Sequence, residues 1–325
     1  MKQKKKSILA ALLLCLFLFA ACSPGGSKGQ PAPGAQAYYS FTDDAGTEIT
    51  LAEKPQKVAV LFSSFADVWR TAGGEVSITV GESIERGFAE GGVLLVDGGA
   101  GKTIDSELLV SYQPDFVICS ADIQAQAEAA KLLNEAGIPA AQFQVESFSD
   151  YLNMLKICTD ITENPQAYQT YGTDVKEEID RLLSEFSANA DTADKKDILF
   201  IRAGSKFSAT KAKTASDNFV CVMLQELGTN NIAEKAEVLL DGLSFEEVLL
   251  SDPDYIFITT MGDEDAAKAY MESLFSEDGW KDLSAVKEKR YSFLPKDLFH
   301  FKPNARWGEA YRYLSGLLDP EATGD

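Results

Sequence analysis

Two segments of the chain share one short pattern, and this repeat limits the possible folds more than any other feature. Glu107 is followed by six residues, Pro114-Asp115 and an apolar run, and Glu246 is followed by six residues, Pro253-Asp254 and a second apolar run. Proline cannot continue a helix. Each segment therefore predicts a helix of about two turns that ends at Pro-Asp and leads into a buried strand.

The residues before each glutamate predict where these helices begin. Asp105 suits the N-cap of the first helix and Ser244 that of the second, because their side-chain oxygens can accept hydrogen bonds from free backbone N–H groups. Ser244 and Glu247 also have the spacing of a capping box. The two glutamates therefore occupy equivalent places, one in each half of the chain.

Strands alternate with helices along most of the sequence. Apolar runs typical of buried strands occur at Val58–Phe62, Phe116–Cys119 and Ile198–Ile201, and each begins a strand–helix unit. A hairpin is expected at residues 38–51, where Asp43–Gly46 has the chemistry of a turn. The alternation predicts an α/β fold with doubly wound, parallel sheets.

One long amphipathic helix interrupts this alternation. From residue 165 onward, apolar side chains recur every three or four positions, at Tyr168, Tyr171, Val175, Ile179, Leu182 and Phe186. Asn164 and Pro165 suit the N-cap and the first helical position. At 1.5 Å per residue the helix measures roughly 35 Å. We therefore expect an N-terminal lobe at 37–163, a connecting helix at 164–189 and a C-terminal lobe at 190–325.

The first 36 residues have the pattern of an export signal and a tether. Basic residues at 2–6 precede an apolar run at 8–19 that is too short to span a bilayer, so residues 1–21 are predicted to be a cleaved signal peptide. Cys22 and the small residues before it resemble a bacterial lipobox, which implies a lipid anchor on Cys22. Residues 22–36 are rich in Gly, Pro and Ser and suit a flexible tether. The alternative is an ordinary secretory signal with a chance cysteine.

Charge and composition exclude several classes of protein. The 325 residues include 30 Lys and Arg against 50 Asp and Glu, an acidic balance unsuited to nucleic acid. His300 is the only histidine, which excludes a metal site built from several histidines. The five cysteines include no Cys-x-x-Cys pair, and pairing among Cys119, Cys158 and Cys221 stays open. We expect neither a resident metal nor a cofactor.

Several segments together resemble one family of transport proteins. They are the hairpin sequence at 41–51, KPQKVAVL at 54–61, the two Glu-x6-Pro-Asp segments, the long helix and LGTNNI at 227–232. In their order and spacing, residues 38–318 resemble the binding lipoproteins of ABC importers for iron siderophores, haem and cobalamin. The resemblance implies two α/β lobes joined by a rigid helix, a ligand held in the cleft between them, and no enzymatic activity.

The resemblance also implies partners. A glutamate on the outer face of each lobe would dock against arginines of the membrane permease, and by position these glutamates are Glu107 and Glu246. The permease would work with a cytoplasmic ATPase. The alternative is that both are acids placed to suit the dipole at the start of a helix. Matched placement in both halves of the chain favours docking.

Ligand contacts are expected in the loops beyond the carboxyl ends of the strands. Residues 198–216 contain no acid but several cations, and residues 293–307 place cations beside aromatic rings. Such side chains suit an anionic, partly planar ligand. The candidates are Phe62, Arg202, Lys206, His300, Lys302, Arg306 and Trp307.

Each candidate also has a simpler interpretation. The lysines would be solvated residues of an acidic protein, and Phe65 and Trp69, which follow Phe62 on a helix, would be core residues. His300 would either pack among Phe299 and Phe301 or, if the ligand is haem, serve as an axial ligand of the iron. No second ligand for haem iron is evident in the sequence. Haem and cobalamin are therefore less favoured than a ferric siderophore.

The competing interpretation is a lipid-anchored surface hydrolase that uses carboxylates such as Asp263, Glu264 and Asp265, although such a run is typical of a solvated helix start. Gly98–Thr103 resembles the end of a phosphate-binding loop, but Val96 stands where the full pattern needs glycine. The sequence favours an exported solute-binding protein, tethered to the outer face of the cytoplasmic membrane, that captures an iron chelate and delivers it to a permease.

Overall fold

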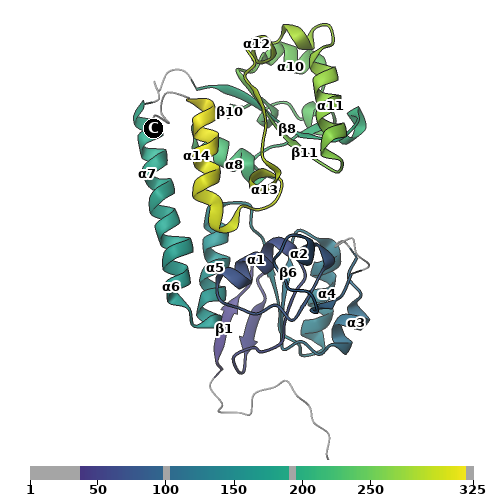
Figure 1. The fold of residues 1–325 in the computed structure, drawn as a ribbon, viewed down its shortest axis with the longest axis vertical. Coiled ribbons are helices and arrows are strands. Elements are labelled where there is room, and N and C mark those ends of the chain that lie inside the picture. Colours follow the sequence, from purple (N-terminus) through teal and green to yellow (C-terminus); the bar gives the residue numbers. More distant parts are fainter. Residues whose placement is uncertain (1–36, 98–102, 190–194, 320–325) are drawn as a thin grey trace, which may run out of the picture. The chain divides into compact units, whose positions relative to one another are not determined.

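Two parallel sheets with helices packed on them form the part of the chain that the computed structural model describes, residues 37–97, 103–189 and 195–319 (Figure 1). The predicted signal peptide at 1–21, the tether at 22–36 with Cys22, and the glycine-rich segment at 98–102 lie outside these residues. Residues 36–325 belong to one compact unit. The expected α/β class with parallel sheets is confirmed.

The N-terminal lobe is built on a sheet of order β5-β4-β3-β6-β7, in which every neighbouring pair is parallel. Its strands are β3 (Val58–Val60), β4 (Ile78–Thr79), β5 (Leu94–Leu95), β6 (Phe116–Ser120) and β7 (Ala140–Phe143). Its helices are α1 (Ser63–Thr71), α2 (Gly81–Glu85), α3 (Ser106–Ser111) and α4 (Gln124–Glu135). The central strands β3 and β6 are buried at every position, which explains their continuous apolar sequences.

The predicted hairpin is present and attaches to the edge of this sheet. Strands β1 (Tyr39–Thr42) and β2 (Glu48–Leu51) pair antiparallel. The Asp43 carboxylate accepts a hydrogen bond from the backbone N–H of Thr47 at 2.7 Å, within the turn. Its second oxygen accepts from the N–H of Gln142 in β7 at 2.9 Å. One acid therefore shapes the turn and joins the hairpin to the edge strand.

The C-terminal lobe has a second parallel sheet, of order β10-β8-β11-β12, with β9 antiparallel to β8. Its strands are β8 (Asp197–Ala203), β9 (Lys211–Ala212), β10 (Asn230–Asn231), β11 (Tyr255–Thr260) and β12 (Tyr291–Phe293). Its helices are α8 (Phe219–Glu226), α9 (Val238–Asp241), α10 (Phe245–Ser251), α11 (Glu264–Phe275), α12 (Ser284–Lys287) and α13 (Lys296–Phe299). Short 3-10 turns occur at Phe207–Ala209, Ile232–Glu234, Trp280–Asp282 and Asn304–Arg306.

The repeated sequence pattern folds in the same way in both lobes. Gln113 after α3 and Asp252 after α10 both have a left-handed backbone, with φ of 51° and 37°. This conformation ends each helix, and the buried prolines that follow lead the chain into β6 and β11. The helix–strand units predicted at Glu107 and Glu246 are therefore confirmed.

The aspartate of each Pro-Asp pair has a structural task that the sequence did not reveal. Asp115 accepts hydrogen bonds from the backbone N–H of Lys57, next to the start of β3, at 2.9 and 3.0 Å. Asp254 accepts one from the N–H of Asp197 at the start of β8, at 2.9 Å. In each lobe the aspartate thus ties the central pair of strands together at their amino ends.

The predicted N-caps differ in outcome. The Asp105 carboxylate accepts from the N–H of Leu108 at 2.9 Å, as expected. Ser244 occupies the N-cap position of α10, but its side chain makes no capping hydrogen bond. Its hydroxyl donates instead to the carboxylate of Glu246 at 3.5 Å. The capping box expected between Ser244 and Glu247 is therefore not formed.

The helical run between the lobes is continuous but not uniformly α-helical. It comprises α6 (Pro165–Tyr168), a π-helical turn at Gln169–Thr173 and α7 (Asp174–Asn189). The Asn164 side chain caps it by accepting from the N–H of Ala167 at 3.2 Å. Within the π-helical turn lies Gly172, where a Cβ atom would stand 3.2 Å from Leu152 of α5 (Phe148–Thr162). Glycine therefore permits the close approach of the two helices.

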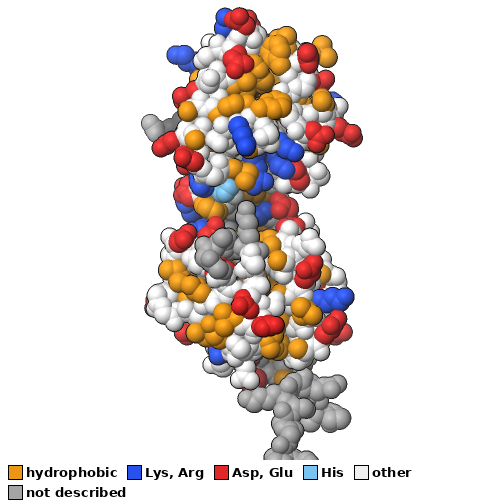
Figure 2. All heavy atoms as spheres, turned by 90° about the vertical axis from the view of Figure 1, so that its right-hand side faces the viewer, with side chains coloured by type: hydrophobic (Ala, Val, Ile, Leu, Met, Phe, Trp, Pro, Cys, Tyr) orange, Lys and Arg blue, Asp and Glu red, His pale blue; other side chains and the backbone are white. Residues whose placement is uncertain are grey.

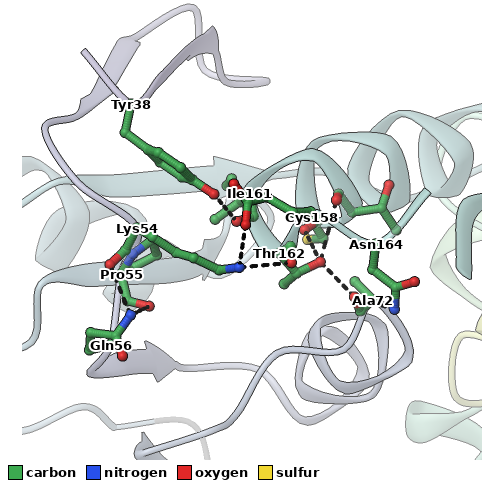
Figure 3. Close-up of polar contacts among 11 residues, drawn as sticks. Tyr38, Lys54, Pro55, Gln56, Ala72, Cys158, Ile161, Thr162 and Asn164 are labelled. Carbon is green, nitrogen blue, oxygen red and sulfur yellow. Dashed lines mark hydrogen bonds and ion pairs between the residues drawn. The ribbon is translucent and has the colours of Figure 1, made fainter. Parts of the chain in front are cut away.

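Hydrogen bonds within the N-terminal lobe hold the end of α5, just before this helical run (Figure 3). The Tyr38 hydroxyl donates to the carbonyl of Ile161 at 2.8 Å, and the Lys54 ammonium donates to that of Thr162 at 3.0 Å. The Thr162 hydroxyl donates to the carbonyl of Ala72, beyond α1, at 2.6 Å. The hairpin, the loop before β3, the end of α1 and the end of α5 therefore meet where the connecting helix begins.

The connecting helix also packs against the C-terminal helix α14 (Trp307–Leu318), which runs beside α7 in Figure 1. Arg312 of α14 forms an ion pair with Glu178 of α7, and the Tyr311 hydroxyl donates to the Glu226 carboxylate of α8. One apolar core continues through both lobes and the connecting helix. Its members include Phe143, Met154, Ile179, Phe200 and Trp307. This shared core makes the link between the lobes stiff.

The cysteines inside the described ranges are not paired. Cys119, Cys158 and Cys221 are free and buried, which answers the question that the sequence left open. Burial raises the pKa of each thiol, so none is a reactive thiolate. No helix within the described ranges is both long enough and apolar enough to cross a membrane.

Candidate functional site

Side chains that follow the strands of the two sheets meet between the lobes. Lys302, in the segment between α13 and α14, pairs with Glu146, which follows β7, at 2.6 Å between Nζ and Oε1. Only 15% and 26% of these two side chains are exposed. The carboxyl ends of both sheets therefore face a common region, where ligands of α/β proteins bind.

A second contact between the lobes is made by Asn304. Its side-chain amide donates to the Ser64 carbonyl and to the Asp67 carboxylate of α1, both at 2.8 Å, and only 1% of the residue is exposed. Its φ of 51° lies in the left-handed region, which asparagine tolerates better than most residues. Burial raises the pKa of Asp67 despite the hydrogen bond. The segment before α14 is thus fastened to the opposite lobe.

Arg86, which follows α2, is the cation that the N-terminal lobe contributes to this region. Its Nη1 donates to the hydroxyl oxygens of Ser63 at 2.8 Å and Ser64 at 3.0 Å. Its guanidinium lies 3.8 Å from the ring centroid of Phe301 and therefore faces the C-terminal lobe. Burial lowers its pKa, although Glu82 opposes the shift. Among the described residues it forms no direct ion pair, but the carboxylates of Glu82 and Asp67 lie near enough to act on its charge, and the rings of Phe88 and Phe301 both lie against it.

The C-terminal lobe contributes Arg202, Lys296 and His300. Arg202 lies near the end of β8, opposite Lys211 of β9, and its partial burial lowers its pKa. Lys296 begins α13 and His300 follows that helix. The imidazole of His300 stands edge-on to the ring of Phe301, with 4.9 Å between the centroids. We call Arg86, Arg202, Lys296 and His300 the interlobe basic cluster.

Burial and these cations together keep the imidazole unprotonated. Burial, followed by the positive charges of Lys296, Arg202 and Arg86, lowers the pKa of His300 to about 4, while Glu82 opposes them. His300 is therefore neutral at pH 7. Figure 2 shows several Lys and Arg side chains near the histidine, on the part of the C-terminal lobe that faces the other lobe, with Asp and Glu side chains also present around them. Cations therefore gather around His300 on the C-terminal side, while Asp67, Glu82 and Glu146 contribute acids from the N-terminal side.

The lowered pKa of His300 predicts a pH dependence of stability. Its ordinary value is 6.5 and its folded value about 4, so the unfolded chain binds more protons between these limits. Stability should therefore rise with pH through this window, and His300→Gln should flatten that rise. Urea unfolding at several pH values between 4 and 6.5 measures both slopes. Parallel curves for the two proteins would show that His300 is not desolvated among these cations.

Two candidates from the sequence have other roles in the structure. The Arg306 guanidinium is held by two carboxylates, with Asp297 at 2.6 Å and Glu309 at 2.7 Å, and both raise its pKa. Its donors are thus engaged on the outer surface. Trp307 is 0% exposed and packs between Phe148 of α5 and Phe219 of α8. It has no surface to offer a ligand, so packing replaces the contact expected for it.

The remaining candidates differ in their surroundings and exposure. Lys302 lies in the region between the lobes, although Glu146 already neutralises it. Phe62 is half-buried before α1 and stands edge-on to Phe65 at 5.0 Å between centroids. Lys206 is exposed before a 3-10 turn, and within the described ranges its side chain makes no hydrogen bond or ion pair with the cluster. Glu107 and Glu246 are exposed in the first turns of α3 and α10.

Sequence reasoning missed Arg86, Glu146 and Asn304. Arg86 stands between Glu85 and Gly87 in an acid-rich segment, where a single cation suggests charge balance rather than a site. The signal that could have found it is its position shortly after β4, beyond the carboxyl end of a strand. Asn304 and Glu146 carry no local signal, because their roles depend on partners in the other lobe.

A cavity of about 560 Å³ lies elsewhere, at the amino ends of β4 and β5. Its lining includes Arg70, Glu75, Phe88 and Glu90, and it includes none of the ligand-contact candidates from the sequence.

The acids considered for a hydrolase have structural roles at the start of α11. Asp263 caps this helix, and Glu264 pairs with Lys268 at 2.6 Å. Among the described residues no group of three or more His, Cys, Asp or Glu side chains is placed to hold a metal ion.

Comparisons with known proteins agree with this architecture. Residues 58–298 match the model of a family described as periplasmic binding protein. Staphylococcus aureus SirA, complexed with staphyloferrin B, has a TM-score of 0.67 and 16% identity over 86% of this chain and 98% of its own. The haem-binding protein RhuT from Roseiflexus sp. RS-1 has a TM-score of 0.63 and 18% identity over 82% of this chain and 99% of its own. The vitamin B12 binding protein BtuF of Vibrio cholerae has a TM-score of 0.66 and 18% identity over 83% of this chain and 99% of its own. No significant match was found among curated protein sequences.

Proposed function

The chain belongs to the periplasmic binding protein family, and from that membership we propose that it captures an anionic ferric chelate outside the cytoplasm and delivers it to the permease of an ABC importer. Members of this family bind their substrates and do not convert them. The hydrolase alternative is therefore set aside, in agreement with the structural roles of Asp263 and Glu264.

The observation that carries the proposal is the interlobe basic cluster. Arg86 and Arg202 come from opposite lobes, both are partly buried, and burial lowers the pKa of both. Glu82 and Asp67 near Arg86, and Asp217 near Arg202, offset only part of the cost of holding these cations out of water, because burial still lowers both pKa values. A chelate that carries several carboxylates or catecholates would supply further compensation through charge-assisted hydrogen bonds to both lobes at once.

The solved neighbours support this range of ligands without selecting one. SirA is described in complex with staphyloferrin B, RhuT as heme-binding and BtuF as vitamin B12 binding. The neutral imidazole of His300 would suit an axial ligand of haem iron. A second iron ligand opposite it is not evident among the described residues, so we place a ferric siderophore first and haem or cobalamin after it.

The remaining parts of the proposal concern where the protein works and what it meets. Export by the signal peptide at 1–21 and lipidation of Cys22 would tether it to the outer face of the cytoplasmic membrane. Glu107 and Glu246, exposed at matching places in the two lobes, would dock against basic residues of the permease, which works with a cytoplasmic ATPase. The stiff link between the lobes supports small hinge motion and release that is prompted by the permease.

The test is calorimetric titration of residues 37–325 with ferric citrate, a ferric tris-catecholate, haemin, cobalamin and phosphate. We expect saturable binding of one ferric chelate, weakened by added salt because the attraction is between charges. Preference for cobalamin, with no dependence on salt, would contradict an anionic ligand. Chemical turnover of any compound would restore the hydrolase alternative.

A further inference from the structure

Helices α3 and α10 correspond position by position, beyond the glutamate and the Pro-Asp that the sequence pattern shows. Two residues after each glutamate, Leu109 and Val248 are both 0% exposed and anchor the helices to their sheets. One residue further, Val110 and Leu249 point out of the protein, with 43% and 46% of their surface exposed. The two lobes thus present the same short surface, an acid and an aliphatic side chain three residues apart.

This matched exposure has no role in folding either lobe. Residues three apart on a helix lie on one face, so Glu107 neighbours Val110 and Glu246 neighbours Leu249. Leu250 extends the second surface and is 81% exposed. A single exposed aliphatic side chain is common on a protein surface, but its recurrence at the same position beside the glutamate in both lobes indicates a shared surface. We call Glu107 with Val110, and Glu246 with Leu249 and Leu250, the two docking patches.

We propose that Val110 and Leu249, together with Leu250, are apolar contacts through which both lobes bind one membrane partner, the permease of the proposed function. The inference rests on that function and adds to it the chemistry of the partner. Each docking patch would meet a basic side chain bordered by an apolar depression, and the partner would offer this arrangement twice. Apolar contact would then supply affinity that exposed ion pairs alone do not provide.

Charge and location support this occupant. Within the described part of the chain neither Glu107 nor Glu246 forms an ion pair, although the protein has many. Both carboxylates are therefore ready for a cation from outside, and the acidic net charge of −20 favours a basic partner. The patches lie on α3 and α10, whereas the basic cluster uses the residue after α2, the end of β8 and the segment at α13. Binding of the ligand and docking are thus assigned to separate surfaces.

The experiment places a photoreactive benzoylphenylalanine at Val110 or at Leu249 of the full chain in its native host, followed by irradiation of living cells. Leu132 of α4, which is 57% exposed, is the matched control position. We expect covalent products with an integral membrane protein from both patches and at least about tenfold less from Leu132. Mass spectrometry identifies the partner and the peptide attached.

Each outcome decides the inference. Products of equal yield from all three positions, or products with soluble proteins only, would overturn it. A probe at Ser106, beside Glu107, separates the two levels of the argument. If that probe reaches a permease while Val110 and Leu249 do not, docking stands and the apolar contacts are wrong. If no position reaches a membrane protein, the docking part of the proposed function fails as well.

Polar variants test the same surface without a bulky probe. With the photoreactive group at Leu250, the double variant Val110→Thr, Leu249→Asn should lower the yield of the permease product about tenfold. Leu132→Asn is the control and should leave the yield unchanged. Ligand affinity and the melting temperature should be unchanged in both variants, because all three side chains are exposed. An unchanged yield in the double variant would contradict the inference.

Discussion

Replacing Glu107 and Glu246 together by arginine is expected to abolish delivery of the ligand while leaving its capture intact. Both side chains are exposed in the first turn of a short helix, so neither contributes to a lobe's core. If the permease presents basic residues, each substitution turns an attraction into a repulsion, and like charges placed together cost several kcal/mol. Uptake should fall by at least about 100-fold, which corresponds to roughly 2.7 kcal/mol.

The measurement is uptake of radioactive iron by cells that carry the full chain, next to calorimetric affinity of the purified variant for the chelate that the titration identifies. The matched control is Glu135→Arg with Glu272→Arg, which reverses one exposed charge on α4 and one on α11. The control should retain uptake, which separates docking from net charge. Equal uptake by the two double variants would remove Glu107 and Glu246 from the docking assignment.

The second large effect is expected at the interlobe basic cluster. Arg86→Gln and Arg202→Gln should each weaken ligand binding by about 100-fold, because truncating one partner of a buried charge pair costs about 2–5 kcal/mol. Lysine at either position should restore only part of the affinity, since it keeps the charge but lacks the planar fork of donors. The slope of affinity against salt concentration should become shallower in both Gln variants.

Arg306→Gln is the control that the sequence itself suggests. Arg306 was as strong a candidate as Arg202, but Asp297 and Glu309 hold its guanidinium on the outer surface. Its loss should leave affinity unchanged. Thermal unfolding of every variant shows whether Arg86→Gln also disturbs the fold, since Arg86 donates to Ser63 and Ser64. If Arg86→Gln and Arg202→Gln bound the ligand as tightly as Arg306→Gln and the unchanged protein, the basic cluster would be excluded as the binding site.

Local sequence predicted the secondary structure and the fold class because each depends on neighbours along the chain. The apolar run at β3 and β6, the proline after α3 and α10, and the Asn164-Pro165 start of the connecting helix are all read within a few residues. The capping box at Ser244 failed for a similarly local reason. Its side-chain oxygen accepts from no backbone N–H of α10, and its hydroxyl donates to the Glu246 carboxylate, a contact that spacing rules do not weigh.

The candidate site was only partly accessible to the same reasoning. Arg202 and His300 belong to the basic cluster and Lys302 lies beside it, because all three lie at the carboxyl end of one sheet, Arg202 in the last residues of β8 and the other two beyond β12. Trp307 and Arg306 looked equivalent to them in sequence. The first packs between aromatic rings of two lobes and the second pairs with two acids, and these are contacts that composition does not show.

By itself the sequence determined that the chain forms two related α/β lobes joined by a long helix, since hydrophobic period, proline and caps act over short separations. Only the tertiary structure decided which charges are engaged and which are left for a ligand. Arg86 faces Phe301 across 215 positions of sequence, and Asn304 reaches Asp67 across 237. Whether a cation is solvated, paired or partly buried depends on such distant neighbours, because burial and Coulomb attraction act through space rather than along the chain.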